Sequence, residues 1–169
     1  MTTLSSENAF RKGLAALVDN QPKAASELFR QALDLERERS KSRMDMRYLS
    51  YYGLSLARAG LSSQTALQAC KQAVSTRPDD PVLLLNLGRV YLHGGRLLPA
   101  LDAFQRGLEV APDNKILRKE LAQIDRRRAP VLRFLHRDHP FNILLGRMRA
   151  SMSRRAVGAT YAGVSPTPR

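Results

Sequence analysis

The chain has 169 residues, of which 43% are hydrophobic and only 6% aromatic, and it contains no tryptophan. This length predicts one domain with a modest core, and the absence of any run of about 18 apolar residues excludes a membrane-spanning helix. Its 28 lysines and arginines exceed its 15 acidic residues, and the resulting charge of +13 favours an anionic partner: nucleic acid, acidic lipid or an acidic protein surface.

Residues 6–39 and 46–80 predict two helical hairpins. The first block has small residues beside one large aromatic residue, as expected where two helices cross closely: Gly13, Ala25, Phe29 and Ala32. The second block repeats this pattern with one extra residue, and its small positions are Gly53, Ala66, Cys70 and Ala73. Pro78 ends the second block, because proline cannot continue a helix.

Residues 81–114 carry the most regular form of the pattern. Gly88 and Ala100 are small where two helices must cross, and Tyr91 and Phe104 are large where space between hairpins must be filled. Pro112 ends the block. Because a hairpin of this kind cannot bury its apolar face alone, the three blocks are expected to stack on one another.

The third block resembles the tetratricopeptide repeat, a family of helical hairpins of about 34 residues. The positions that carry the resemblance are Leu84, Leu87, Gly88, Tyr91, Ala100, Phe104, Gly107 and Pro112. The resemblance implies an all-α fold, a right-handed superhelix of stacked antiparallel helical hairpins, also called an α-solenoid. Its repeats would be residues 6–39, 46–80 and 81–114.

Residues 114–128 predict a further helix that caps the stack and completes a repeat domain over residues 6–128. Its apolar positions recur at helical spacing: Ile116, Leu117, Leu121 and Ile124. Asp113 or Asn114 is expected to cap its start. Such a helix covers the last apolar face of a repeat array and turns polar residues outward.

Residues 129–155 predict a basic amphipathic arm, and residues 156–169 a flexible tail of small residues. The basic residues assigned to the arm and to the helix end before it are Arg126, Arg127, Arg128, Arg133, Arg137, Arg147, Arg149, Arg154 and Arg155. The apolar face of the arm comprises Phe134, Phe141, Leu144, Leu145 and Met148. Three hypotheses stay open: the arm folds back on the repeats, docks on a protein partner, or contacts a membrane or nucleic acid.

The family's groove is lined by the first helix of each hairpin, so the resemblance also implies a partner-binding groove. The residues expected to line it are Phe10, Leu14, Arg47, Leu54, Arg58, Leu85, Arg89 and His93. Apolar side chains with arginines among them suit a peptide that carries apolar residues and one or two carboxylates. The alternative is that several of these residues belong to the core.

Some members of the family bind a chaperone's C-terminal carboxylate through lysine and asparagine in the groove. At the corresponding places this chain has Phe10, Leu14 and Val82, so that mode of binding is not expected. The sequence also lacks a glycine-rich phosphate loop, a nucleophile elbow and a paired-histidine zinc motif. We therefore expect no catalytic residue, no metal and no cofactor.

These patterns predict a non-enzymatic adaptor or scaffold that binds a protein partner, with an acidic or apolar surface, through the groove and the arm. The alternative is a protein that associates with RNA, DNA or an anionic membrane through the arm, and self-association into homo-oligomers also stays open. The first residues show no signal-peptide pattern, and the single Cys70 cannot form an internal disulfide. Both features predict a cytoplasmic location.

Overall fold

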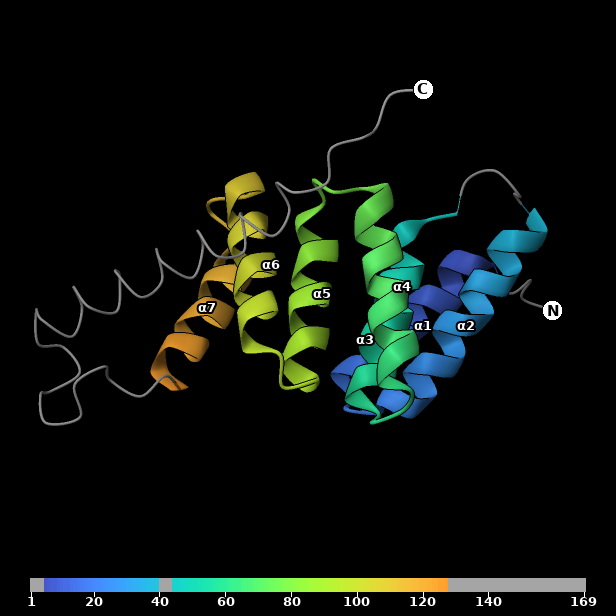
Figure 1. The fold of residues 1–169 in the computed structure, drawn as a ribbon. Coiled ribbons are helices and arrows are strands. Elements are labelled where there is room, and N and C mark those ends of the chain that lie inside the picture. The colour runs from blue at the N-terminus through green and yellow to red at the C-terminus, as the bar shows by residue number, and fades with distance from the viewer. Residues whose placement is uncertain (1–4, 40–43, 128–169) are drawn as a thin grey trace, which may run out of the picture. The chain divides into compact units, whose positions relative to one another are not determined.

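The computed structural model describes residues 5–39 and 44–127, and within these ranges it contains seven α-helices and no strand (Figure 1). The helices are α1 (Ser6–Val18), α2 (Pro22–Arg39), α3 (Met46–Arg58), α4 (Ser63–Thr76), α5 (Pro81–His93), α6 (Leu97–Val110) and α7 (Lys115–Arg127). Helices α1–α2, α3–α4 and α5–α6 form three antiparallel hairpins that stack side by side. The predicted all-α fold of stacked helical hairpins is therefore confirmed.

The chain divides into two compact units, residues 1–124 and 125–169, and the hairpins belong to the first. Arg126 and Arg127 end α7, whereas the other residues assigned to the arm, and the whole tail, lie outside the described residues. None of the described helices combines the length and the apolar composition needed to cross a bilayer.

Polar side chains directly before the first helix of each hairpin, and before the capping helix, accept hydrogen bonds from the amides at the helix start. Ser5 accepts a hydrogen bond from the Asn8 amide, and Asp80 accepts from the amides of Val82 and Leu83. Asp45 does the same for α3. Helix α7 is capped by Asn114, one of the two caps expected from the sequence. Its Oδ1 accepts hydrogen bonds from the amides of Ile116 and Leu117.

The three turns inside the hairpins share one geometry. Two residues after each first helix ends, the backbone is left-handed: Asn20 (φ 55°), Gly60 (φ 67°) and Gly95 (φ 69°). The residue that follows donates its amide to a carbonyl five positions back, at 2.8–3.0 Å, so each turn satisfies a carbonyl that the helix end leaves free. Because the turns alternate with the inter-hairpin loops, all three lie along one edge of the stack (Figure 1).

Glycines set how closely the two helices of each hairpin approach. A Cβ atom added at Gly13 would lie 2.6 Å from the Phe29 ring, and one added at Gly88 would lie 2.3 Å from the Phe104 ring. In the second hairpin Cys70 stands where the others have phenylalanine. There a Cβ at Gly53 would lie 2.6 Å from the carbonyl oxygen of Ala66, because the smaller side chain lets the α4 backbone come closer.

Aromatic residues and the last helix complete the core. The rings of Phe10, Phe29, Tyr48 and Tyr51 pack together at centroid distances of 4.7–5.7 Å and join the first hairpin to α3. Leu117 and Ile124 of α7 are buried with Phe104 of the third hairpin. A Cβ at Gly107 would lie 2.9 Å from Leu117, so glycine at this place leaves room for the capping helix.

Candidate functional site

The residues expected to line a groove all lie on the first helices of the hairpins, but the structure divides them by burial. Phe10, Leu54 and Leu85 are only 4%, 2% and 6% exposed, so they belong to the core and offer almost no area to a partner. For these three the expectation of a groove lining is wrong, because each side chain is packed within a buried hydrophobic cluster. Leu14 is half-buried, and the four basic residues remain at the surface or partly exposed.

Each of the three arginines is held by a partner within the chain. Arg47 pairs with Asp45 at 2.6 Å, and its guanidinium lies 5.8 Å above the centre of the Phe10 ring. Arg89 pairs with Glu120 of α7 at 2.8 Å. Arg58 donates to the Leu17 carbonyl at 3.3 Å and to Asn20 Oδ1 at 3.1 Å, so it joins α3 to the end of α1.

Arg58 differs from the other two arginines because these hydrogen-bond acceptors are neutral, so they leave its charge uncompensated. At the end of α5, burial first, and then the charges of Arg58 and Arg89, lower the pKa of the His93 imidazole. Arg58 of α3 and Arg89 and His93 of α5 are together called the cationic strip below. Within the strip, Arg58 carries the positive charge that its own acceptors leave uncompensated, whereas Arg89 is paired with Glu120 and the neutral form of His93 is favoured.

Replacing Arg58 by glutamine should raise the pKa of His93. The loss of one positive neighbour makes protonation easier, while burial still holds the pKa below the usual 6.5. Because the lowered pKa favours the neutral imidazole in the folded chain, His93 contributes to stability above pH 6.5. This contribution is lost as the pH falls below 6.5 and the imidazole becomes protonated. Titration of the His93 resonances by NMR measures the effect, with Arg106→Gln as control. An unchanged or lower pKa in Arg58→Gln would contradict the proximity of the two residues.

A polar pair lies buried between the second and third hairpins. Asn86 Nδ2 donates to Ser50 Oγ at 3.1 Å, and both side chains are completely buried. The thiol of Cys70 donates to the Ser50 carbonyl at 3.3 Å, and burial raises the pKa of this thiol to about 12. Cys70 is therefore a core residue, as expected, and its thiol is not poised to act as a nucleophile.

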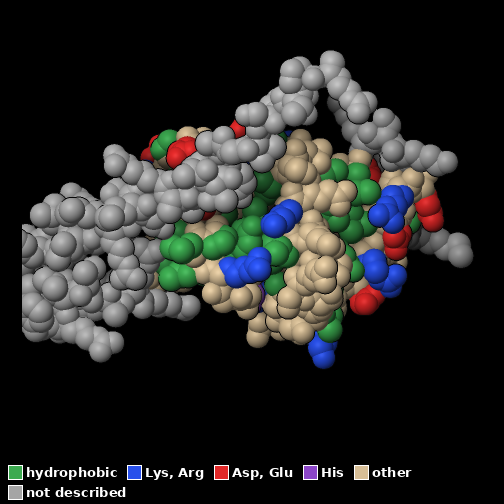
Figure 2. Space-filling model, in the orientation of Figure 1, with side chains coloured by type: hydrophobic (Ala, Val, Ile, Leu, Met, Phe, Trp, Pro, Cys, Tyr) green, Lys and Arg blue, Asp and Glu red, His purple; other side chains and the backbone are tan. Residues whose placement is uncertain are grey.

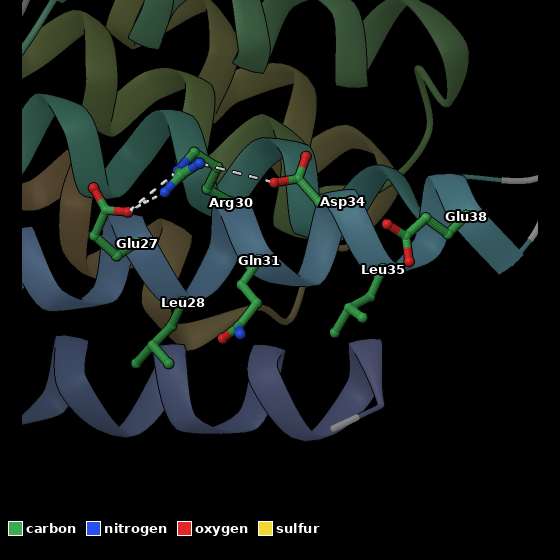
Figure 3. A pocket seen from close by; sticks show the side chains of 7 residues that line it. All are labelled: Glu27, Leu28, Arg30, Gln31, Asp34, Leu35 and Glu38. Atoms are coloured by element: carbon green, nitrogen blue, oxygen red, sulfur yellow. Dashed lines mark hydrogen bonds and ion pairs between the residues drawn. The ribbon is translucent and has the colours of Figure 1, made fainter. Parts of the chain in front are cut away.

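The described residues also form a cleft outside the predicted groove. They contain no group of three histidine, cysteine or acidic side chains that could hold a metal ion. One cleft of about 350 Å³ is lined by residues of α2 alone, and Figure 3 shows Arg30 lying between Glu27 and Asp34 there. Acidic and basic side chains are interspersed along this helix (Figure 2), and Arg30 pairs with two of the three acidic residues that line the cleft.

Sequence comparison identifies the repeats. A family model described as tetratricopeptide repeat matches residues 63–124. Residues 63–124 thus match the tetratricopeptide repeat family. Over 62 residues it is 32% identical to mouse Sperm-associated antigen 1, a match that covers 37% of this chain and 7% of that protein. Over 61 residues it is 31% identical to human Protein O-mannosyl-transferase TMTC1, and this match covers 36% of this chain and 7% of that protein.

Solved tetratricopeptide structures share the fold at low sequence identity. The first such domain of human RPAP3 superposes with a TM-score of 0.59 at 16% identity, over 72% of this chain and 90% of that one. The first such domain of Spaghetti, bound to the HSP90 peptide SRMEEVD, superposes with a TM-score of 0.57 at 16% identity, over 72% of this chain and 91% of that one. PcrH in complex with the chaperone-binding region of PopB superposes with a TM-score of 0.56 at 19% identity, over 73% of this chain and 99% of that one.

Three residues of the candidate site were not foreseen from the sequence. Glu120, which fixes Arg89, lies 31 positions away in the chain, and Asn20, which fixes Arg58, lies 38 positions away. The third is Tyr51, whose hydroxyl interacts electrostatically with Arg89 and Arg47. Burial raises the pKa of this hydroxyl, while the charges of the two arginines act to lower it. The tyrosine pattern Tyr48–Tyr51–Tyr52 on α3 was the available signal.

Proposed function

We propose that this protein is a non-enzymatic adaptor that binds a segment of a partner protein on the surface of α1, α3 and α5. The observation that carries the proposal is the cationic strip, in which Arg58 has only neutral acceptors and lies close to Arg89 and His93. The partner segment would place a carboxylate on the strip and apolar side chains beside it.

Structural relatives support a peptide ligand of this kind. Similar folds hold an HSP90 peptide in Spaghetti and the chaperone-binding region of PopB in PcrH. In this chain, however, buried Phe10 and half-buried Leu14 stand where chaperone-binding members carry lysine and asparagine. The proposed carboxylate contact is therefore at the ends of α3 and α5, and the ligand is an internal acidic segment with apolar residues.

Partly exposed apolar side chains are available on α1 and α5. Leu14, Val82 and Leu92 are each half-buried, so each keeps part of its surface free for a ligand. The floor below them is rigid, since Leu54 and Leu85 are packed into the core. A surface with a packed floor, a few partly exposed apolar residues and one cationic end favours an extended or helical segment held at one orientation.

The double variant Arg58→Gln/His93→Gln should bind such a segment about tenfold more weakly than the parent chain, because one charge-assisted hydrogen bond contributes about that much. The probes are peptides selected on the parent protein from a phage-displayed library, with affinity measured by fluorescence anisotropy. The control Arg77→Gln/Arg106→Gln also removes two basic side chains, both exposed and away from the strip, and should bind like the parent.

Two further readouts decide the proposal. The selected peptides should be rich in Asp or Glu together with Leu or Ile, and their binding should raise the pKa of His93, because a bound carboxylate favours the imidazolium. Peptides that are basic, or that bind both double variants equally well, would contradict a carboxylate contact on the strip. Thermal melts of the variants separate a loss of binding from a loss of folding.

A further inference from the structure

The edge of the stack that holds the three hairpin turns exposes apolar side chains at every turn. Four large aliphatic residues lie there: Val18 (85% exposed), Leu61 (41%), Leu97 (37%) and Leu98 (54%). They come from the end of α1, the α3–α4 turn and the start of α6. These four residues are called the apolar turn edge below.

The same edge is basic, whereas the opposite edge is acidic. Residues 18–24, 57–63 and 93–99 contain three basic residues, Lys23, Arg58 and Arg96, against the single carboxylate of Asp19. At the opposite edge, residues 5–8, 36–39, 44–47, 76–82 and 109–115 contain eight acidic and five basic residues. The described stack is therefore polarised, with positive charge on the edge that exposes the aliphatic side chains.

We propose that the apolar turn edge is a contact surface for an anionic lipid bilayer. The three turns lie along one side of the stack (Figure 1), so a single surface can meet all of them at once. Aliphatic side chains would enter the interfacial region, while Lys23 and Arg96 would meet lipid phosphates. This contact uses the turns themselves and meets the peptide surface at the ends of α3 and α5, where Arg58 belongs to both.

The spacing of the apolar residues favours a bilayer over a folded partner. They are separated by polar positions, including Gln21, Ser62 and Arg96, and do not form one continuous patch. A protein interface concentrates its apolar residues in a packed centre surrounded by polar groups. A fluid bilayer instead accommodates single side chains that enter at separate points, with binding that depends on apolar area and on attraction to anionic lipid.

The test is a pair of matched double variants of the full chain. Leu61→Ser/Leu98→Ser removes aliphatic groups that are 41% and 54% exposed on the turn edge. Val110→Ser/Ile116→Ser removes groups that are 43% and 52% exposed on the opposite edge. Binding is measured by cosedimentation with vesicles of phosphatidylcholine and phosphatidylserine, and with vesicles of phosphatidylcholine alone.

The parent and the Val110/Ile116 variant are expected to bind the vesicles that contain phosphatidylserine equally well, and the Leu61/Leu98 variant about tenfold more weakly. Binding should weaken with added salt and on vesicles without phosphatidylserine. Three results would overturn the proposal: no binding by the parent, equal loss in both double variants, or full retention in the Leu61/Leu98 variant. The last result would assign any vesicle binding to another part of the chain. Circular dichroism melts confirm that all three proteins are folded.

Discussion

Replacing Phe104 by alanine should lower the free energy of unfolding by about 3–5 kcal/mol, as the loss of a fully buried phenylalanine does in well-packed cores. Phe104 is 0% exposed, and its ring fills the space above Gly88 between α5 and α6. It is also buried with Leu117 and Ile124 of α7. The substitution would therefore open a cavity that two hairpin helices and the capping helix share, and no one of them can close it alone.

Urea unfolding followed by circular dichroism measures this effect. The matched control is Leu98→Ala on the same helix, which is 54% exposed and should change the stability by less than about 0.5 kcal/mol. A loss of under about 1 kcal/mol in Phe104→Ala would mean that the space around the ring collapses, and that the packing described for the third hairpin is not rigid.

Adding one methyl group at Gly53 should also destabilise the chain, by about 2 kcal/mol. Alanine is the better helix former by about 1 kcal/mol, but overpacking a close helix crossing costs up to about 3 kcal/mol. The obstacle is the carbonyl oxygen of Ala66 at 2.6 Å, which is backbone, so α3 and α4 would have to move apart. A side chain could rotate away from the new methyl group, whereas a helix backbone cannot.

Gly94→Ala is the control for this change. Gly94 has a φ of −83°, and a Cβ there would have no neighbour closer than 3.6 Å, so the substitution should be neutral within about 0.5 kcal/mol. If Gly53→Ala proved as stable as Gly94→Ala in the same urea experiment, the close approach of α3 and α4 at Gly53 would be refuted.

The pairing of helices within each hairpin could be predicted from the sequence because it depends on local spacing. Gly13 meets Phe29, and Gly88 meets Phe104, at the positions where the pattern placed a small residue opposite a large one. Asn114 caps α7 through its side chain, which is also a local property. Such features require only the periodicity of a helix and the residue types at its ends.

The candidate site could be predicted only in part, because it depends on how far neighbouring hairpins slide and tilt against each other. The family resemblance placed Phe10 and Arg47 on the same side of the stack, but it did not show that Phe10 packs against Tyr48 and lies beneath the Arg47 guanidinium. The partners of Arg58 and Arg89 come from other hairpins or from α7. Pairings of this kind are absent from the pattern of any single block.

Asn20 takes the left-handed position that glycine fills in the other two hairpin turns, and its side chain accepts the hydrogen bond from Arg58. At the other end of α1, the Tyr48 hydroxyl donates to Glu7 at 3.0 Å. The first hairpin is thus tied to the second at both ends of its first helix. Terminal units of a repeat stack open most easily, since they have one neighbour instead of two. These two ties resist that opening, so the first two hairpins should unfold as one cooperative unit.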